Sequence, residues 1–576
     1  MVKKILLPSF CKSLFSGVIL DELVFPYPKP SADDQQNLDM ILDTLHKFAD
    51  RVLDSKKFDQ AEQMPVEVIK GWKELGFFGL IIPEKYGGAG LNITSYVRIL
   101  EEIGTYDGST ALLIGAHQSI GLKGLLLYGT EQQKKKYLPK LASGELIAAY
   151  ALTEPGAGSD AGSIQTRAVR DETKGVYRLN GSKMWITNGG IADFITIFAK
   201  EEIQTDPNKK QDKITAFMVT RDMGFTSGKE EKKLGIRSSS TTALYLDNVE
   251  VPFENVLGER GKGFKVGMEI LNSGRVSLAA GAIGASKNTL AQIIKYITER
   301  KQFGQTLSEF EIIKKKITQI SLNIFAAESM VYLTCGMIDS EKIDFSLESA
   351  ICKVFATEAL WVNVNECMQM AGGIGYSQEY PYEQFVRDAR IMTIFEGTSE
   401  ILRVFISLAG MEERGEYLKK IGKALKDPVK SFGLITDFAV QYMKDRLTKE
   451  RLRVIHPILA KSKAEFENWA KNLSITTERV LIKYGKDIVM REMIHERLAD
   501  AIIYLYAMIA CISRVDSDIR ARGMENCLDE ISMCNLFCDQ AWRIIRRNIL
   551  MVDKNEDENI IKVANIVLEN RKYPLH

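Results

Sequence analysis

The feature that most constrains the fold is a change in hydrophobic period that occurs twice. Before about residue 147, apolar residues such as Leu45, Phe48 and Val52 recur at helical spacing. Between 147 and 258, apolar and polar residues alternate and short β-rich runs appear. Helical spacing then returns from about residue 263 and continues to 410. This order predicts a mainly α protein with a central antiparallel β domain.

The same shifts in pattern divide the chain into six segments. We expect an N-terminal arm (1–30), a helical domain (31–146), a β domain (147–258), a helical bundle (259–412), an amphipathic and basic linker (413–457) and an additional helical domain (458–576). Inside the β domain, Asn180-Gly181 is a hairpin signal.

Within the linker, residues 431–453 join an apolar helical face to a basic cluster. Ile435, Phe438 and Tyr442 lie on one side of that helix, and Lys444 and Arg446 follow closely. Two interpretations stay open. The segment lies on an anionic membrane surface as a peripheral contact, or it packs on the rest of the protein.

Composition excludes several classes of protein. The 576 residues carry 76 basic and 75 acidic side chains, which disfavours a nucleic-acid binder. No apolar run reaches the roughly 18 residues that span a bilayer. The eight cysteines are sparse and lie in apolar contexts, so we expect buried free thiols and no metal site. Residues 1–20 carry Lys3, Lys4 and Lys12 but no arginine, and they suit a presequence or an ordinary arm equally.

Three segments carry chemistry. A loop from Thr153 to Asp160 is rich in Gly and Ser, and it offers backbone N–H groups and hydroxyls to a polar ligand. Trp185 offers a flat surface for a planar ring. Glu396 lies between Phe395 and Gly397 after an apolar stretch, where a raised pKa would make it a general base. Taken alone, the pattern is weak, and a helix-start residue near a turn is the favoured interpretation of Glu396. There is no strand–Gly-x-Gly-x-x-Gly–helix unit, so a Rossmann site is disfavoured.

These segments, together with Arg300 to Gly304, Gln369 to Gly375 and Phe395 to Thr398, resemble the acyl-CoA dehydrogenase family in the order of their motifs. The N-terminal arm and the helices after 410 resemble its very-long-chain subgroup, which includes a relative that helps assemble respiratory complex I. The resemblance implies a helical domain, a β domain and a four-helix bundle, followed by an extra C-terminal helical domain. It also implies FAD bound without a Rossmann fold.

The resemblance assigns roles residue by residue. Residues implied to line the flavin are Tyr150, Leu152, Thr153, Ser159, Trp185 and Thr187. Those implied to hold the FAD of a partner subunit, or to flank its nucleotide, are Arg300, Gln302, Phe303, Gln369, Gly372, Gly373, Thr398 and Glu400. The substrate side is implied to comprise Ser159, Leu271, Gly274, Arg275, Phe395 and Gly397. A cofactor site shared in this way implies a homodimer.

Glu396 is implied to be the catalytic base that removes the α proton of an acyl-CoA. Some family members carry the base at the position of Gly274, where glycine cannot act, and this strengthens the case for Glu396. Arg275 resembles the arginine that positions the base. We also expect Gly115 and Ala116 to wall a slot for acyl chains of about sixteen carbons or more.

The first expected function is α,β-dehydrogenation of long-chain acyl-CoA in mitochondrial β-oxidation, with electrons passed to electron-transferring flavoprotein. The matrix side of the inner membrane is the expected location. A second hypothesis is that the protein is a respiratory complex I assembly factor that retains the dehydrogenase fold. Glu379 to Tyr382 favours the second hypothesis, and Ala424 to Pro428 favours the first. A third, a peroxisomal acyl-CoA oxidase, is disfavoured because the terminal peroxisomal address is missing.

Overall fold

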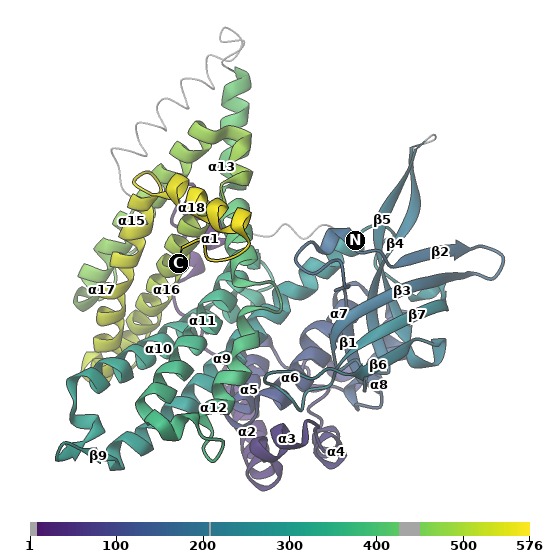
Figure 1. Cartoon of the computed structure of the whole chain (residues 1–576), viewed down its shortest axis with the longest axis horizontal. Helices are drawn as coiled ribbons and strands as arrows, with labels where there is room; N and C mark the ends of the chain where they lie inside the picture. The colour runs from purple at the N-terminus through teal and green to yellow at the C-terminus, as the bar shows by residue number, and fades with distance from the viewer. Residues whose placement is uncertain (1–7, 207–208, 425–449, 576) are drawn as a thin grey trace. The chain divides into compact units, whose positions relative to one another are not determined.

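The computed structural model describes residues 8–206, 209–424 and 450–575 (Figure 1). These residues form two compact units. The main unit spans Pro28–Ser399, and the second unit joins the N-terminal 27 residues to Glu400–His576.

The main unit begins with helices, most of which start at a capping side chain. These helices are α2 (Ala32–Val52), α3 (Ser55–Ala61), α4 (Val66–Glu74), α5 (Ile93–Tyr106), α6 (Gly108–Gly115), α7 (Lys123–Tyr128) and α8 (Glu131–Ala142). The Asn92 side chain accepts a hydrogen bond from the backbone N–H of Ser95, which caps the start of α5. A π-helical turn, Ala116–Gly121, joins α6 to α7.

The β sheet follows as predicted, with one difference in pairing. Its strands are β1 (Ala148–Ala151), β2 (Arg167–Asp171), β3 (Val176–Thr187), β4 (Phe194–Asp206), β5 (Lys209–Thr220), β6 (Thr226–Glu230), β7 (Thr241–Pro252) and β8 (Val256–Leu257). The strand order is β6-β7-β3-β2-β4-β5-β8, with β1 on β4. Most neighbours are antiparallel, but β1 and β2 both pair with β4 in parallel. The sheet is therefore mixed rather than purely antiparallel.

The predicted hairpin at Asn180-Gly181 is wrong. Strand β3 runs straight through these residues, and its register against β7 shifts between Leu179 and Gly181. A Cβ at Gly181 would lie 2.5 Å from the Thr166 hydroxyl oxygen. The glycine therefore marks a bulge where two backbones approach closely, which is its other common use within a strand.

Four long or medium helices complete the main unit after the sheet. They are α9 (Gly263–Glu299), α10 (Glu311–Asp339), α11 (Ser346–Ala371) and α12 (Tyr382–Arg390), with the short hairpin β9 (Lys301–Gln302) and β10 (Gln305–Thr306) after α9. Helix α9 packs against α5, α10 and α11. A Cβ at Gly284 of α9 would lie only 1.9 Å from the Glu101 carbonyl oxygen of α5. Glycine is thus what lets these two helices approach each other.

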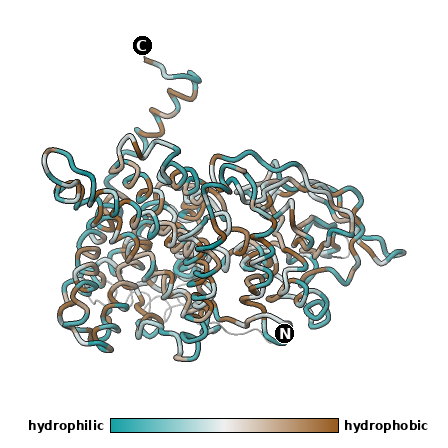
Figure 2. Tube along the Cα trace, turned by 90° about the horizontal axis from the view of Figure 1, so that it is seen from below, coloured by the Kyte–Doolittle hydropathy of each residue, from teal (hydrophilic) through white to brown (hydrophobic). Residues whose placement is uncertain are grey.

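The second unit is helical. It contains α1 (Phe10–Phe15), α13 (Ser399–Ala424), α15 (Ala460–Tyr484), α16 (Glu492–Arg522), α17 (Leu528–Met551) and α18 (Asp557–Asn570). The middle of α16, from Ala501 to Ser513, is almost wholly buried against α15 and α17. Helix α18 has no buried residue, and Figure 2 shows apolar stretches along the helix that leads to the C-terminus.

The predicted amphipathic linker falls largely outside the described residues. Residues 425–449 are not described, so the prediction for 431–453 rests on sequence alone over most of its length. The described residues 450–456 have no regular secondary structure.

The sequence predicts no membrane-spanning segment and predicts buried free cysteines, and the structure bears on both predictions. By length and composition, three described helical stretches are long and apolar enough to cross a membrane: Gly108–Tyr128, Glu311–Asp339 and Glu492–Arg522. The expectation of none is therefore wrong on that criterion, although 61%, 72% and 83% of their most apolar windows are buried inside the protein. All eight cysteines are buried free thiols, as predicted.

Candidate active site

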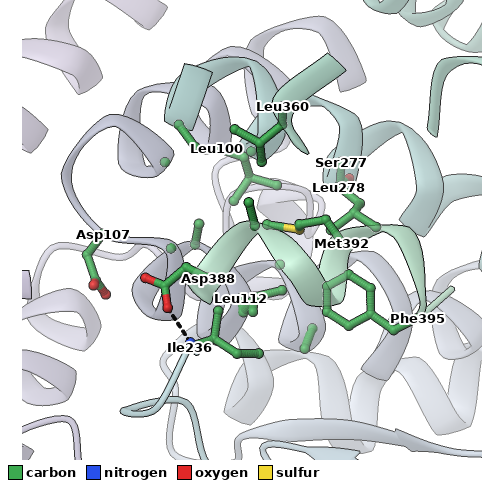
Figure 3. Close-up of a pocket in the computed structure, with 18 of the residues that line it drawn as sticks. Leu100, Asp107, Leu112, Ile236, Ser277, Leu278, Leu360, Asp388, Met392 and Phe395 are labelled. Carbon is green, nitrogen blue, oxygen red and sulfur yellow. Dashed lines mark hydrogen bonds between the residues drawn. The ribbon is translucent and has the colours of Figure 1, made fainter. Parts of the chain in front are cut away.

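A cavity lies inside the main unit, between α5, α6, α9, α11 and α12 (Figure 3). Large apolar side chains such as Leu100, Leu360 and Phe395 form part of its wall. The remaining wall is unusual for its many small residues: Gly104, Gly108, Ala111, Gly115, Ala116, Gly274, Gly281, Ala285 and Ala389. Because these wall residues have little or no side chain, they leave a wide apolar slot, which suits a long hydrocarbon ligand.

Glu396 lies on the wall of this cavity. It sits in a turn between a 3₁₀ segment, Ile391–Thr393, and α13, and its φ is 59°. The next residue, Gly397, has a φ of 94°. A left-handed conformation is uncommon for a non-glycine residue and is found where surrounding structure holds it, often at functional sites.

The Glu396 carboxylate is buried without a hydrogen bond from a described residue to its Oε2 atom. Burial raises the pKa of Glu396, while the nearby charges of Arg275 and Lys353 act in the opposite direction. The net direction is upward from the ordinary value of 4.5. A carboxylate in this state can accept a proton readily, which is what a general base requires.

Helix α9 supplies the opposite wall. A Cβ on Gly274 would lie 2.7 Å from the Ile120 side chain and 3.3 Å from Glu396 Oε2. Gly274 therefore leaves the space that the Glu396 carboxylate uses. The buried Arg275 donates from Nε to the Glu396 carbonyl oxygen at 3.3 Å and from Nη1 to Asn272 at 3.0 Å.

Another part of the cavity wall is polar. Asp388 accepts a hydrogen bond from the Ile236 backbone N–H at 2.5 Å, and burial raises its pKa to about 7 (Figure 3). Asp107 caps α6 through the Thr110 backbone N–H at 2.7 Å and accepts from the Ser55 hydroxyl at 2.6 Å. Sequence reasoning singled out none of these residues.

The Gly-rich loop lies at the start of the sheet and is anchored by a buried ion pair. Lys183 of β3 donates to Glu154 at 2.7 Å and to the Leu152 carbonyl at 3.2 Å. Leu152 is buried, Thr153 is half-buried and Ser159 is exposed. Gly156 and Gly158 have open space where a Cβ would stand.

Two predicted flavin residues of β3 lie beside this loop. Trp185 is 55% exposed and has a φ of 61°, so a large flat ring is held at the surface. Thr187 reaches the cavity that Glu396 lines. Tyr150 of β1 packs its ring on Phe198, and its phenol donates to the Gly267 carbonyl at 3.3 Å. An exposed aromatic face beside open loop backbone fits a planar cofactor with polar substituents.

The remaining predicted cofactor residues are not brought to this cavity. Phe303 is 95% exposed with a φ of 52°, on the hairpin that follows α9. Arg300, Gln302, Gln369, Gly372, Gly373 and Glu400 are exposed, and Thr398 is half-buried. Figure 1 shows the β9 hairpin far from strands β1 and β3. Lys316 near the start of α10 pairs with Glu366 near the end of α11, which puts the two exposed segments at the same end of the bundle.

The substrate-side predictions divide in the same way. Gly274, Phe395 and Glu396 line the cavity, and Gly115 and Ala116 line it as expected. Arg275 and Gly397 contribute to the turn that carries Glu396. Leu271 is half-buried on α9 but is not part of the cavity wall, and Ser159 stands on the exposed loop.

Sequence reasoning missed Lys353, Ile120 and Ser277. Ile120 and Ser277 line the cavity, and Lys353 donates to the Gly397 carbonyl at 2.8 Å. A charged residue in the apolar stretch Ala350–Ala356 was the one available signal for Lys353. His117, in contrast, is a core residue. Its Nδ1 accepts from the Ala148 N–H at 2.8 Å, and burial lowers its pKa to about 3.

The site therefore joins a buried carboxylate on a largely apolar cavity to a strand that presents an exposed tryptophan. Family models agree along the chain. The N-terminal, middle and C-terminal domains of acyl-CoA dehydrogenase match residues 35–145, 149–249 and 261–410. The chain belongs to the acyl-CoA dehydrogenase family, and it is an FAD-dependent enzyme acting on CH–CH bonds.

Its subgroup follows from the second unit. Residues 457–573 match the ACAD9/ACADV C-terminal domain. The very long-chain specific acyl-CoA dehydrogenase of Bos taurus mitochondria is 41% identical over 96% of this chain and 85% of its own length. The predicted family, subgroup, fold class and cofactor are thus confirmed.

Solved structures show the same fold. An acyl-CoA dehydrogenase from Bacillus anthracis, complexed with FAD, matches with a TM-score of 0.79 and 32% identity over 98% of this chain and 96% of that chain. A chain from a structure of the electron transferring flavoprotein of Acidaminococcus fermentans matches with a TM-score of 0.61 and 37% identity, over 66% of this chain and 98% of that chain.

Proposed function

We propose that this enzyme dehydrogenates long-chain acyl-CoA at the α and β carbons, with Glu396 as its base. The observation that carries the proposal is the Glu396 carboxylate on the cavity wall, buried and with an Oε2 that accepts no hydrogen bond from the described residues. Burial raises its pKa, which suits proton removal from a weak carbon acid. When bound, FAD supplies the acceptor for the hydride that leaves the β carbon.

The chain's own residues would handle the charge that develops on the substrate. As the α proton leaves, negative charge builds on the thioester oxygen, and a backbone donor in a dry site stabilises it. No hydrogen bond from the Glu396 backbone N–H to another described residue is present, so this donor suits the task. An apolar acyl chain that fills the slot would exclude water and strengthen these interactions.

The width of the slot supports a long acyl chain. Gly115 has only Leu100 near its missing Cβ, at 4.0 Å, and Gly281 has nothing within 4 Å. Both glycines line the cavity, and a larger side chain at either position would protrude into it. The 41% identity to the very long-chain specific enzyme of Bos taurus points the same way.

Cofactor binding would need two copies of the chain. The exposed Arg300, Gln302 and Phe303, and the open Gly372 and Gly373, would hold the nucleotide half of a FAD whose flavin lies against Trp185 of the partner subunit. A homodimer follows from this division. The partner that takes the electrons would be electron-transferring flavoprotein, in the mitochondrial matrix. Contact of residues 431–453 with the inner membrane stays a prediction from sequence.

The test is anaerobic mixing of the flavin-loaded protein with palmitoyl-CoA while the flavin absorbance is followed. We expect rapid bleaching and formation of trans-2-enoyl-CoA in the native enzyme, and no rapid bleaching in Glu396→Gln with the same flavin content. Bound FAD that is not bleached by long, medium or branched acyl-CoA would refute the dehydrogenase proposal. Co-purification with complex I intermediates would then support the assembly function.

A further inference from the structure

The turn that carries Glu396 is held by two buried cations from two helices. Arg275 of α9 donates to the carbonyl of Glu396 at 3.3 Å. Lys353 of α11 donates from Nζ to the carbonyl of Gly397 at 2.8 Å. The two carbonyls belong to successive residues with φ of 59° and 94°. The left-handed conformation of Glu396 is one that surrounding contacts must hold, whereas Gly397 adopts it without strain.

Lys353 is wholly buried, in the middle of an apolar stretch of α11. Burying an ammonium group costs free energy unless polar partners meet it. The carbonyl oxygen of Gly397 is one such partner, and it lies in the turn that aims the Glu396 carboxylate. A lysine in this place is therefore tied directly to the geometry of that turn.

The way the cations bind is informative. Arg275 and Lys353 each donate a hydrogen bond to a backbone carbonyl of the turn. These two hydrogen bonds fix the backbone of the turn and therefore the position of the Glu396 carboxylate, whose Oε2 accepts no hydrogen bond from the described residues.

We propose that Lys353 is a positioning residue for the reaction: it holds the Gly397 carbonyl so that the Glu396 carboxylate stays aimed into the cavity. This rests on the proposed role of Glu396. Two charged groups act on Glu396, Arg275 on α9 and Lys353 on α11, and burial together with Glu396 raises the pKa of Tyr150 on β1. Charge from Lys353 counters the rise in the Glu396 pKa that burial produces.

Lys353→Met keeps most of the aliphatic length and removes the charge and the donor. We expect its rate of flavin bleaching by palmitoyl-CoA to fall about 10- to 100-fold, because small misplacements of reacting groups carry costs of that size. We also expect the acid limb of the rate-against-pH profile to move to higher pH, since loss of a nearby positive charge raises the pKa of Glu396. Lys353→Gln, which keeps a shorter donor without the charge, should recover part of the rate but keep the shifted limb.

Lys287→Met is the matched control. Lys287 is a half-buried lysine of α9 that binds Glu101 at 2.6 Å, away from the Glu396 turn. It should lower stability without moving the acid limb. Normal rate and an unmoved limb in a flavin-loaded Lys353→Met enzyme would overturn the inference. If Lys353→Met does not fold, the limb in Lys353→Gln decides instead.

Glu396→Gln belongs in the same series because it distinguishes an error in the role of Lys353 from an error in the assignment of Glu396 as the base. If Glu396→Gln does not bleach while both Lys353 variants behave as wild type, only the positioning role of Lys353 is wrong. If Glu396→Gln bleaches its flavin at the native rate, the base assignment itself is wrong, whatever the Lys353 variants do.

Discussion

At the scale of single residues, the charge of Glu396 decides whether the site can act. Its folded pKa is raised because burial outweighs the attraction of Arg275 and Lys353. A protonated glutamate cannot accept the α proton, so the rate must fall as pH drops through that pKa.

The pH profile tests this directly. The first-order rate of flavin reduction by palmitoyl-CoA, measured by rapid mixing between pH 4 and 9, should show an acid limb above the ordinary glutamate value of 4.5. A limb at or below 4.5 would mean that the carboxylate is not held in the apolar setting described here.

His117 gives a second prediction at this scale, about stability. Burial lowers its pKa to about 3 from an ordinary 6.5, so the unfolded chain gains a proton first as pH falls. The stability that neutral His117 contributes is complete above 6.5 and is lost progressively towards 3. From pH 7 to pH 5 this one residue should remove roughly 2 kcal/mol.

Urea unfolding of the wild type and of His117→Gln at the two pH values measures that contribution. The substitution will itself cost stability, so the quantity compared is the change between pH values in each protein. The wild type should lose roughly 2 kcal/mol more than the variant. Equal losses would show that His117 is protonated in the folded state.

At the scale of elements, the acyl slot is built by the spacing of small residues along α5, α6 and α9. Gly115→Leu should place a branched side chain in open cavity. We expect kcat/KM for palmitoyl-CoA to fall at least about tenfold while that for octanoyl-CoA changes little, since a few lost methylene contacts are worth this much.

Gly415→Leu is the control, because Gly415 is a helical glycine of α13 that lies outside the cavity. It should leave the ratio of the two substrates unchanged. An unchanged ratio in Gly415→Leu and in Gly115→Leu alike would show that Gly115 does not limit chain length.

Elements also show what sequence could and could not predict. The periods of 3.6 and 2 depend on local burial, so the two helical regions and the sheet between them follow from the pattern. The hairpin prediction at Asn180-Gly181 is wrong because the same dipeptide suits either a turn or a bulge. The close approach of Thr166, a residue distant in sequence, decides between the two. The slot walls and the pairing of Lys353 with Gly397 depend on how distant helices pack, which no local period contains.

At the scale of the whole molecule, the proposed dimer predicts complementation between two inactive chains. Glu396→Gln lacks the base but keeps Arg300, whereas Arg300→Ala keeps the base but should hold its cofactor poorly. If each FAD is held by two subunits, a mixed dimer regains one complete site, because the unaltered Glu396 and the unaltered Arg300 meet across the interface.

Refolding or co-expressing the two variants together should therefore restore flavin reduction that neither shows alone, up to about half of the wild-type activity per dimer. Each variant alone, carried through the same procedure, is the control. Mixed dimers with no activity would place Arg300 and Glu396 in the same site of one chain and remove this argument for the dimer.

The central claim is that Glu396 takes the α proton, and the neighbouring Tyr150 phenol is the alternative group to exclude. Burial and Glu396 hold the pKa of Tyr150 well above its usual range, so it should stay protonated and be unable to act as a base. The measurement is rapid anaerobic reduction by palmitoyl-CoA with and without deuterium at the α carbon, in wild type, Glu396→Gln and Tyr150→Phe at equal flavin content. We predict a slower reaction with deuterium in the wild type, a loss of about 10²- to 10⁴-fold in Glu396→Gln and a loss of less than tenfold in Tyr150→Phe. Near-native reduction by Glu396→Gln, with the isotope effect intact, would contradict the account.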